Sequence, residues 1–132
     1  MEKRVVSKKR YTFPKKERLS LKRDIELLFE KGETFLSFPL RIVYLKTESP
    51  AESPVSIMVS VPKKRIRKAA DRNHIKRHVR ESYRMRKNEL LESCKAKSKR
   101  LFIAFLYIHG KKLPYQDMER AMTKAMRILM SK

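Results

Sequence analysis

Residues 101–107 read LFIAFLY, an apolar run that is rich in aromatic and branched side chains. Such a run predicts a strand that is buried on both faces at the centre of a sheet. Segments 40–44 and 55–61 place apolar side chains at every second position, which predicts two further strands with one buried face each. We expect these two strands to pair with each other as an antiparallel hairpin.

Three helices are predicted around the strands, because apolar residues recur there at helical spacing. The first is expected at Ser20–Lys31, with the serine as N-cap and Gly32 as its stop. The second is expected from Asp71, a suitable N-cap, to about Cys94. The last begins after Pro114, with an apolar stripe that covers the sheet. The order α-β-β-α-β-α predicts one α+β domain whose helices pack on a small mixed sheet, with a parallel pair of strands joined by the second helix.

The length of 132 residues fits a single domain with a modest core. A basic segment precedes this domain, with five lysines and arginines before Phe13. Because Pro14 and the repeated charges disfavour a helix, we expect this segment to be extended and flexible. The sequence therefore predicts a flexible N-terminal segment at residues 1–18 and one α+β domain at residues 19–132.

The charge of the chain indicates a polyanionic partner. Lysine and arginine total 35 against 14 acidic residues, so the formal net charge is +21. This charge is spread over several elements, which favours nucleic acid over a membrane surface. The longest apolar run is too short to span a bilayer, and the single cysteine excludes a disulfide framework. We expect a nucleic-acid-binding protein of the reducing cytoplasm that does not contact membranes.

Residues 71–81 read DRNHIKRHVRE and predict the binding surface. On a helical wheel at about 100° per residue, cations gather on one arc beside an apolar arc. The polar arc comprises Arg72, Asn73, Lys76, Arg77 and Arg80, and it is prolonged by Arg84 and Lys87. Cations this close repel each other unless a polyanion neutralises them, and arginine forms bidentate contacts with phosphate. We predict that this arc binds nucleic acid, with further contacts from the preceding basic loop at Lys63, Lys64 and Arg65.

The side chains do not predict catalysis by the protein itself. Its acidic residues are scattered and form no convincing ligand set for a two-metal nuclease. His74 and His78 could share a helix face, but no third ligand accompanies them and the neighbouring cations would repel a metal ion. A glycine-rich phosphate loop is also lacking, since the only glycines are Gly32 and Gly110. We predict no metal site and no catalytic residue in the chain.

The basic helix also resembles a known signature. Arg72-Asn73, Ile75-Lys76-Arg77 and Arg80-Glu81 are similar to the RNR signature of the bacterial ribonuclease P protein subunit. The resemblance covers roughly residues 19–130 and includes a strand and basic loop at residues 60–64. An apolar strand and a final helix follow in the order of the family.

This resemblance implies a protein that joins a large catalytic RNA to form the endoribonuclease that removes the 5′ leader from precursor tRNA. The RNA subunit carries the metal-dependent hydrolysis, so Mg²⁺ is expected through the RNA and no cofactor on the protein alone. The signature helix is expected to contact the catalytic RNA. A cleft between the first helix and the sheet is expected to bind the single-stranded leader through Ile25, Phe29 and Tyr44. Ile25 stands where the family commonly has an aromatic residue.

Two other hypotheses remain open from the sequence. A structural ribosomal protein that binds rRNA explains the charge but not the spacing of the signature. A sequence-specific DNA-binding protein could use the helix from Arg72 to Arg84, but no dimerisation element or helix-turn-helix partner is evident. Preferential binding of precursor tRNA over mature tRNA, in the presence of the catalytic RNA, would separate the ribonuclease P hypothesis from these two.

Overall fold

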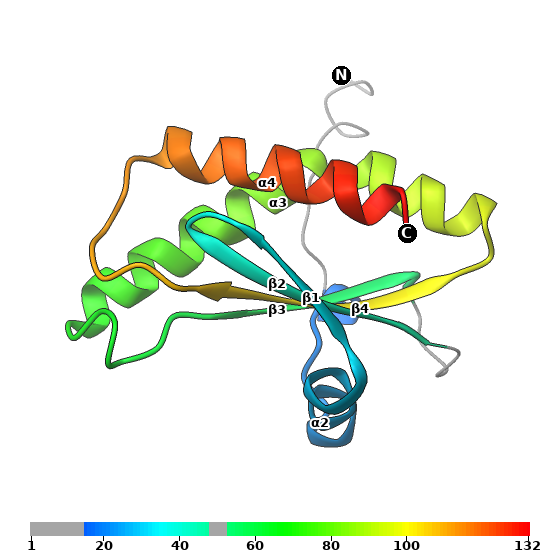
Figure 1. The fold of residues 1–132 in the computed structure, drawn as a ribbon, viewed down its shortest axis with the longest axis horizontal. Coiled ribbons are helices and arrows are strands. Elements are labelled where there is room, and N and C mark those ends of the chain that lie inside the picture. Colours follow the sequence, from blue (N-terminus) through cyan, green and yellow to red (C-terminus); the bar gives the residue numbers. More distant parts are fainter. Residues whose placement is uncertain (1–14, 48–52) are drawn as a thin grey trace.

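The computed structural model describes residues 15–47 and 53–132, and Figure 1 labels their helices and strands. Within these two ranges no helix is long and apolar enough to cross a bilayer. The elements are η1 Lys15–Glu17, α2 Lys22–Lys31, β1 Glu33–Ser37, β2 Leu40–Thr47, β3 Val55–Ser60, α3 Ala69–Ala96, β4 Arg100–Tyr107 and α4 Tyr115–Met130. They form one α+β domain in which η1 is a single 3₁₀ turn before the first helix.

β4 is a central strand of a mixed four-stranded sheet, as its apolar run predicts. The strands lie in the order β1-β2-β4-β3. β2 pairs antiparallel with β4, and β3 pairs parallel with β4, which confirms the parallel pair joined by the long helix. The predicted hairpin between residues 40–44 and 55–61 is wrong, because β4 lies between these two strands. A strand that is apolar on both faces is buried best with a neighbour on each side, and β4 takes that place.

The hairpin partner of β2 is β1, a strand that the sequence analysis did not predict. The two strands are antiparallel and pair Glu33 with Tyr44 and Ser37 with Leu40. Along β1 only Ser37 is buried and Phe35 is half-buried, so this short edge strand shows no regular hydrophobic alternation. The observed order of helices and strands is therefore α-β-β-β-α-β-α.

Glycine and proline set the helix boundaries that the sequence predicts. α2 ends at Lys31, and α4 begins directly after Pro114. Gly32 is required by packing, because a Cβ at this position would clash with the carbonyl oxygens of Leu28 and Tyr44. The glycine therefore permits the end of α2 to lie directly against β2.

The predicted N-caps are wrong. Leu21 occupies the N-cap of α2 in place of Ser20, and α3 begins at Ala69, two residues before Asp71. Neither helix start has a hydrogen bond from a side-chain cap. Asp71 lies in the first turn of α3, where a carboxylate complements the helix dipole, and it pairs with the Lys112 ammonium at 3.3 Å.

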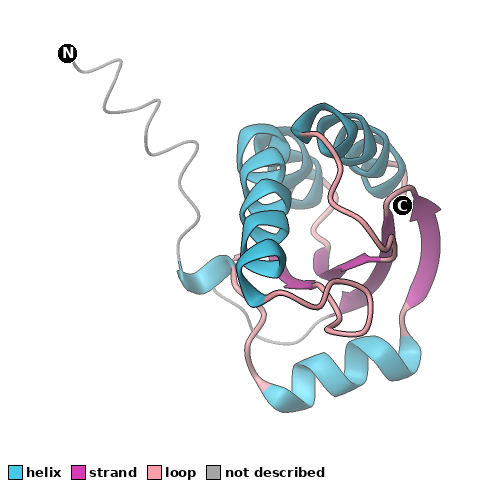
Figure 2. Ribbon diagram, turned by 90° about the vertical axis from the view of Figure 1, so that its left-hand side faces the viewer, coloured by secondary structure: helices cyan, strands magenta, loops and turns pink. Residues whose placement is uncertain are grey.

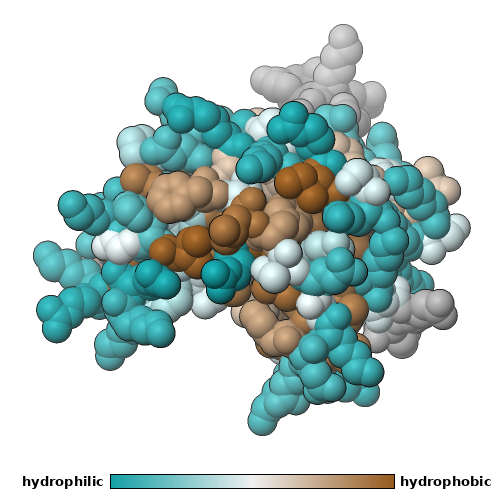
Figure 3. Space-filling view, in the orientation of Figure 1, coloured by the Kyte–Doolittle hydropathy of each residue, from teal (hydrophilic) through white to brown (hydrophobic). Residues whose placement is uncertain are grey.

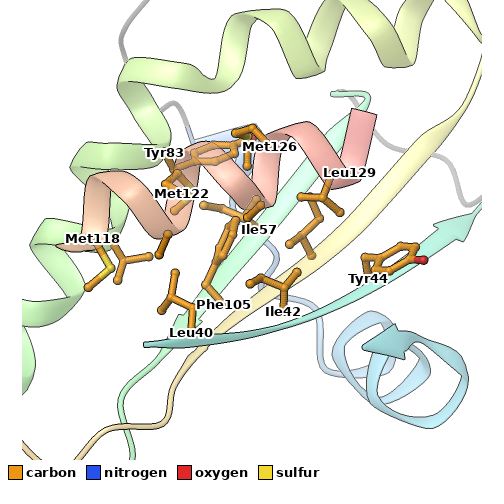
Figure 4. Packing of buried hydrophobic residues seen from close by; sticks show 14 of the residues in the cluster. Leu40, Ile42, Tyr44, Ile57, Tyr83, Phe105, Met118, Met122, Met126 and Leu129 are labelled. Atoms are coloured by element: carbon orange, nitrogen blue, oxygen red, sulfur yellow. The ribbon is translucent and has the colours of Figure 1, made fainter. Parts of the chain in front are cut away.

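α3 and α4 cover one face of the sheet, and α2 lies on the other, as Figures 1 and 2 show. The larger cluster of buried side chains lies beneath α3 and α4, and Figure 4 shows part of it. The stripe of α4 is buried there, as predicted, through Met118, Ala121, Met122, Ala125, Met126 and Leu129. A smaller cluster beneath α2 consists of Leu19, Leu28, Val43, Phe102 and Ala104.

Residues 16–19 connect the start of the described chain to α3 and to the edge strand β3. The Leu19 N–H donates to the Ile57 carbonyl at 2.7 Å. The Glu17 carboxylate and the Lys87 ammonium form an ion pair at 2.7 Å, and Lys87 is only 2% exposed. Lys87 therefore does not prolong the basic arc of α3, because Glu17 binds it within the core. Of the predicted N-terminal segment, residues 1–14 lie outside the described residues.

Candidate nucleic-acid interface

The basic surface of α3 is centred on four of the predicted residues. Asn73, Arg77, Arg80 and Arg84 lie at helical spacing on one side of the helix, and we call them the signature face. Together with Glu81 they line a shallow hollow of about 370 Å³. Asn73, Arg77 and Arg80 are exposed, so the amide and two guanidinium groups are accessible to a ligand. Planar guanidinium groups on an open helix suit a row of phosphates.

Arg84 is held in place at one end of this face. Its Nε and Nη2 donate to the two carboxylate oxygens of Glu81, at 3.2 Å and 2.6 Å. This bidentate pair is on the surface, so it contributes little to folding stability. It fixes the direction of the Arg84 guanidinium along the helix and offsets its charge, so Arg77 and Arg80 supply most of the positive charge of the hollow.

Arg72 lies away from the hollow and contacts the basic loop instead. Its guanidinium donates to the carbonyl oxygens of Ile66, at 3.0 Å, and Arg67, at 2.6 Å. Ile66 is buried, so the loop is fixed by an apolar anchor and by these two hydrogen bonds. The position of Arg72 therefore indicates that it orders the loop, and direct contact of Arg72 with RNA stays a prediction.

The basic loop itself presents three predicted cations to solvent. Lys63, Lys64 and Arg65 are exposed in a turn in which the Arg65 N–H donates to the Pro62 carbonyl at 3.0 Å. Lys76, the remaining predicted residue, is half-buried on α3. The loop and the signature face thus form one basic surface at the N-terminal end of α3.

Two histidines of α3 contact each other, and one of them contacts α4. The ring centroids of His74 and His78 are 4.2 Å apart, and His78 meets Tyr115 edge to face at 5.1 Å. Burial and the neighbouring His74, Arg77 and Lys112 lower the pKa of His78. Residues 15–47 and 53–132 contain no group of three side chains that could hold a metal ion.

α2 leaves part of its own sheet face uncovered. Residues directly opposite each other on neighbouring strands share a face of the sheet, so the strand pairing defines rows across it. Val43 and Ala104 belong to the row that packs under α2. The next row, which we call the open row, consists of Leu36, Arg41, Leu106 and Ser60. Leu36 and Arg41 are exposed, while Leu106 and Ser60 are half-buried.

Phe29 lies on the flank of α2 that faces the open row. On the other flank, Lys31 lines a hollow together with Leu45 and Lys46. Phe29 is about 200° from Lys31 around the helix, so it points the opposite way. Its ring is 46% exposed, and Ile25, one turn earlier, packs half-buried against the cluster beneath α2. Two of the three predicted leader-cleft residues therefore lie together beside an uncovered strip of sheet.

Tyr44 does not join them, which corrects the predicted cleft. Successive residues of a strand point to opposite faces, and since Val43 packs under α2, Tyr44 points toward α4. Figure 4 shows its ring at the rim of the larger cluster. The Tyr44 hydroxyl donates to the Glu33 carboxylate at 3.2 Å, and burial followed by the nearby Glu33 charge raises the pKa of Tyr44.

Two strand residues beside the Phe29 flank of α2 were not among the predicted cleft residues. Arg41 and Leu106 occupy the open row that Tyr44 was expected to share. The signal that could have found Arg41 is the alternation of β2, which places it on the same face as Val43. Figure 3 shows apolar side chains at the surface over the β1–β2 hairpin, where Leu36 is 55% exposed and Phe38 62% exposed.

Comparison with known proteins supports the resemblance. Residues 13–130 match the family described as Ribonuclease P. The ribonuclease P protein component of Porphyromonas gingivalis is 38% identical over 112 residues, which cover 85% of this chain and 82% of that protein. The ribonuclease P protein component of Chlorobium phaeobacteroides is 35% identical over 96 residues, or 67% of this chain and 66% of that protein.

Solved structures share the fold. The ribonuclease P protein of Staphylococcus aureus superposes with a TM-score of 0.68 at 18% identity, over 85% of this chain and 94% of that chain. The ribonuclease P protein of Thermotoga maritima gives a TM-score of 0.57 at 24% identity, over 88% of this chain and 97% of that chain. From the family match and the relative of 38% identity, we conclude that the chain belongs to the ribonuclease P protein family.

Proposed function

We propose that this chain acts as the protein subunit of ribonuclease P by binding two RNAs on adjoining surfaces. The signature face and the basic loop bind backbone phosphates of the catalytic RNA. The open row and the Phe29 flank of α2 bind the single-stranded 5′ leader of precursor tRNA. The observation that carries the proposal is the position of the open row, an uncovered strip of sheet on a fold whose basic helix bears the family signature.

The signature face supports the first contact through its charges. Among the described residues, Arg77 and Arg80 form no ion pair, and both are exposed. The positive potential at the N-terminal end of α3 adds to these cations. A row of phosphates would neutralise charges that otherwise repel each other along the helix.

The open row supports the second contact through its mixed chemistry. A single strand is bound by a positive groove that tracks the backbone and by apolar or aromatic faces that contact the bases. Arg41 supplies a cation, Leu36 and Leu106 supply apolar surface, and Phe29 supplies an exposed ring. Ile25 stands where the family commonly has an aromatic residue, so it offers aliphatic packing in place of base stacking. Charge therefore contributes a larger share of the affinity for the leader in this protein than where that residue is aromatic.

The hydrolysis itself is assigned to the RNA subunit, with Mg²⁺ bound through that RNA. The protein chain binds and orients the leader while its fixed cations reduce repulsion between the RNA backbones. We place this activity in the cytoplasm, since the single cysteine, Cys94, is a buried free thiol of the kind found in reducing compartments. The relatives described above are ribonuclease P proteins, so the ribosomal alternative gains no support from them.

The test is multiple-turnover cleavage of a precursor tRNA by the catalytic RNA of the same organism at low magnesium, with and without this protein. We expect strong stimulation by this protein and none by an unrelated protein of equal charge. Arg77→Ala/Arg80→Ala should lower the log–log salt slope of catalytic-RNA binding by about 0.7–0.9 per lost phosphate contact. Absence of stimulation by the folded wild-type protein would refute the proposal.

A further inference from the structure

A second concentration of lysines lies at the opposite end of α3 from the signature face. Figure 1 shows that the C-terminal ends of α3 and α4 lie at the right-hand end of the view, where β4 begins. The Nζ of Lys97 donates to the Met130 carbonyl at 2.8 Å, which joins the two helix ends directly. We call the following residues the C-terminal pole: Lys31, Lys46, Lys97, Lys99 and Lys132.

The C-terminal pole contains a hollow of about 440 Å³. Its lining comprises Lys31, Glu33, Tyr44, Leu45, Lys46 and Lys132. The one carboxylate of this lining, on Glu33, already accepts a hydrogen bond from the Tyr44 hydroxyl at 3.2 Å. Within residues 15–47 and 53–132, neither Lys31 nor Lys46 forms an ion pair. The lining therefore holds three lysines against one acidic side chain, so its net charge favours an anion.

A structural role accounts for only part of this charge. Lys97 and Lys99 lie near the last carbonyls of α4, where cations complement the helix dipole. Partial burial is the main cause that lowers the pKa of Lys99, and the nearby charges of Lys97 and Lys46 act in the same direction. Lys31 lies in the last turn of α2 and complements the dipole of that helix, whereas Lys46 lies on β2 and has no such role. A polyanion at the pole would convert the repulsion between these cations into attraction.

The pole is remote from both surfaces of the proposed function. α3 spans 28 residues, so its two ends are about 40 Å apart at the rise of an α-helix. Lys31 and Phe29 lie on opposite flanks of α2, so a leader on the open row would have to cross the helix to reach the pole. In the proposed function the catalytic RNA already lies on the signature face of α3, so it is the RNA that we assign to the pole.

We propose that the C-terminal pole is a second phosphate-binding surface for the catalytic RNA, separated from the signature face by the C-terminal part of α3, which extends about 18 Å beyond Arg84. The inference rests on the proposed function, because it takes the catalytic RNA as the partner. The contact is independent of base sequence, since lysines bind the phosphate backbone and the one aromatic residue of the lining, Tyr44, is buried. Two anchors at opposite ends of a rigid helix would fix the orientation of the protein on the RNA, and hence the direction of the leader.

The test compares two double variants of equal charge in binding to the catalytic RNA. Lys31→Gln/Lys46→Gln removes two exposed cations of the pole and leaves the α4-capping lysines in place. Arg120→Gln/Lys124→Gln removes two exposed cations from the middle of α4, away from its C-terminal end, and serves as the control. We expect the pole variant to lower the log–log salt slope by about 0.7–0.9 per lysine, and the control to leave it nearly unchanged.

Three outcomes would overturn the inference. Equal slopes for the pole variant and the wild type would mean that these lysines do not contact the catalytic RNA. Equal losses in both double variants would indicate a general effect of net charge. Weaker binding of precursor tRNA with unchanged binding of the catalytic RNA would assign the pole to the substrate. Arg77→Ala/Arg80→Ala, measured in parallel, separates these results from failure of the proposed function.

Discussion

The two faces of the sheet differ in how completely they are covered. α3 and α4 close one face, and the apolar stripe of α4 is buried along its whole length. On the other face a single helix of 10 residues, α2, packs over Val43 and Ala104 and leaves the open row partly uncovered, with Leu106 packed against the cluster beneath α2. Exposed apolar side chains remain beside it, at Phe29 and Leu36.

This difference indicates that the face covered by α3 and α4 contributes most of the folding stability, whereas the face under α2 is available for binding. A closed face with few voids gains most from burial, so its residues can be changed only at a cost in folding. A half-covered face gains less from burial and keeps apolar surface available for a ligand. The proposed function follows this division, because the leader is placed on the open face and the catalytic RNA on the outer side of α3.

Phe105→Ala tests whether the closed face carries the stability. Phe105 is fully buried, and its ring lies 5.8 Å from that of Tyr83. Loss of this side chain should lower the free energy of unfolding by about 3–5 kcal/mol, because a cavity remains in a packed core. Urea unfolding followed by circular dichroism measures the change. A loss below about 1 kcal/mol would contradict the comparison, because surface substitutions cost that little.

Glu17→Ala tests the ion pair that joins the start of the described chain to α3. The substitution leaves the Lys87 ammonium buried without this carboxylate, which typically costs 3–5 kcal/mol for a buried pair. Because residues 16–19 can detach locally, we expect a loss of up to about 3 kcal/mol in urea unfolding.

The matched control for this pair replaces both charges by apolar side chains. Glu17→Met/Lys87→Met should recover most of the lost stability, because no uncompensated charge remains in the core. If the double variant is as unstable as Glu17→Ala, the contribution of Glu17 does not depend on its pairing with Lys87.

The sequence predicts the elements of the closed face better than their pairing. The apolar run of β4 and the stripe of α4 are strong local signals, and both occur where predicted. The pairing of the strands depends on which strand lies at the centre of the sheet. Because β4 is apolar on both faces, it lies between β2 and β3, and these two strands do not form the expected hairpin. The sequence does not predict β1, because this five-residue edge strand has an exposed Leu36 and lacks the alternation of apolar and polar residues that is typical of a strand.

The candidate site shows which side-chain positions follow from local sequence and which depend on contacts with distant parts of the chain. The helical wheel finds Asn73, Arg77 and Arg80, since spacing alone places them on one side of α3. It cannot show that Lys87, on the same arc, meets Glu17 from a distant part of the chain. Tyr44 fails for a similar reason, because the face of a strand residue depends on which helix covers which side.

Phe29→Ala tests whether the open face binds the leader. The ring is 46% exposed, so its removal should change the free energy of unfolding by less than about 1 kcal/mol. If a leader base stacks on this ring, affinity of the holoenzyme for precursor tRNA should fall by about 1–3 kcal/mol, with unchanged affinity for mature tRNA. Equilibrium binding of both tRNAs measures the difference.

Met85→Ala is the matched control for Phe29. Met85 is 45% exposed on α3, which covers the closed face and lies away from the open row. Its replacement by alanine therefore removes a side chain of similar exposure to Phe29. We expect no preferential loss of precursor binding from this variant. Equal effects of the two substitutions on both tRNAs would assign Phe29 to packing and leave the open face without a demonstrated ligand.

The smallest expected change in stability concerns His78, a residue of α3 whose ring contacts Tyr115 of α4 at the rim of the closed face. Burial and the nearby His74, Arg77 and Lys112 lower the pKa of His78 in the folded protein, while the unfolded chain keeps the ordinary value near 6.5. Between these two values the unfolded state binds more protons, so stability should fall as the pH decreases below about 6.5. Thermal unfolding at pH 7.5 and pH 5.5 measures this change. His78→Gln should lose less stability over this range than the wild type, and an equal loss would assign the pH dependence to other groups.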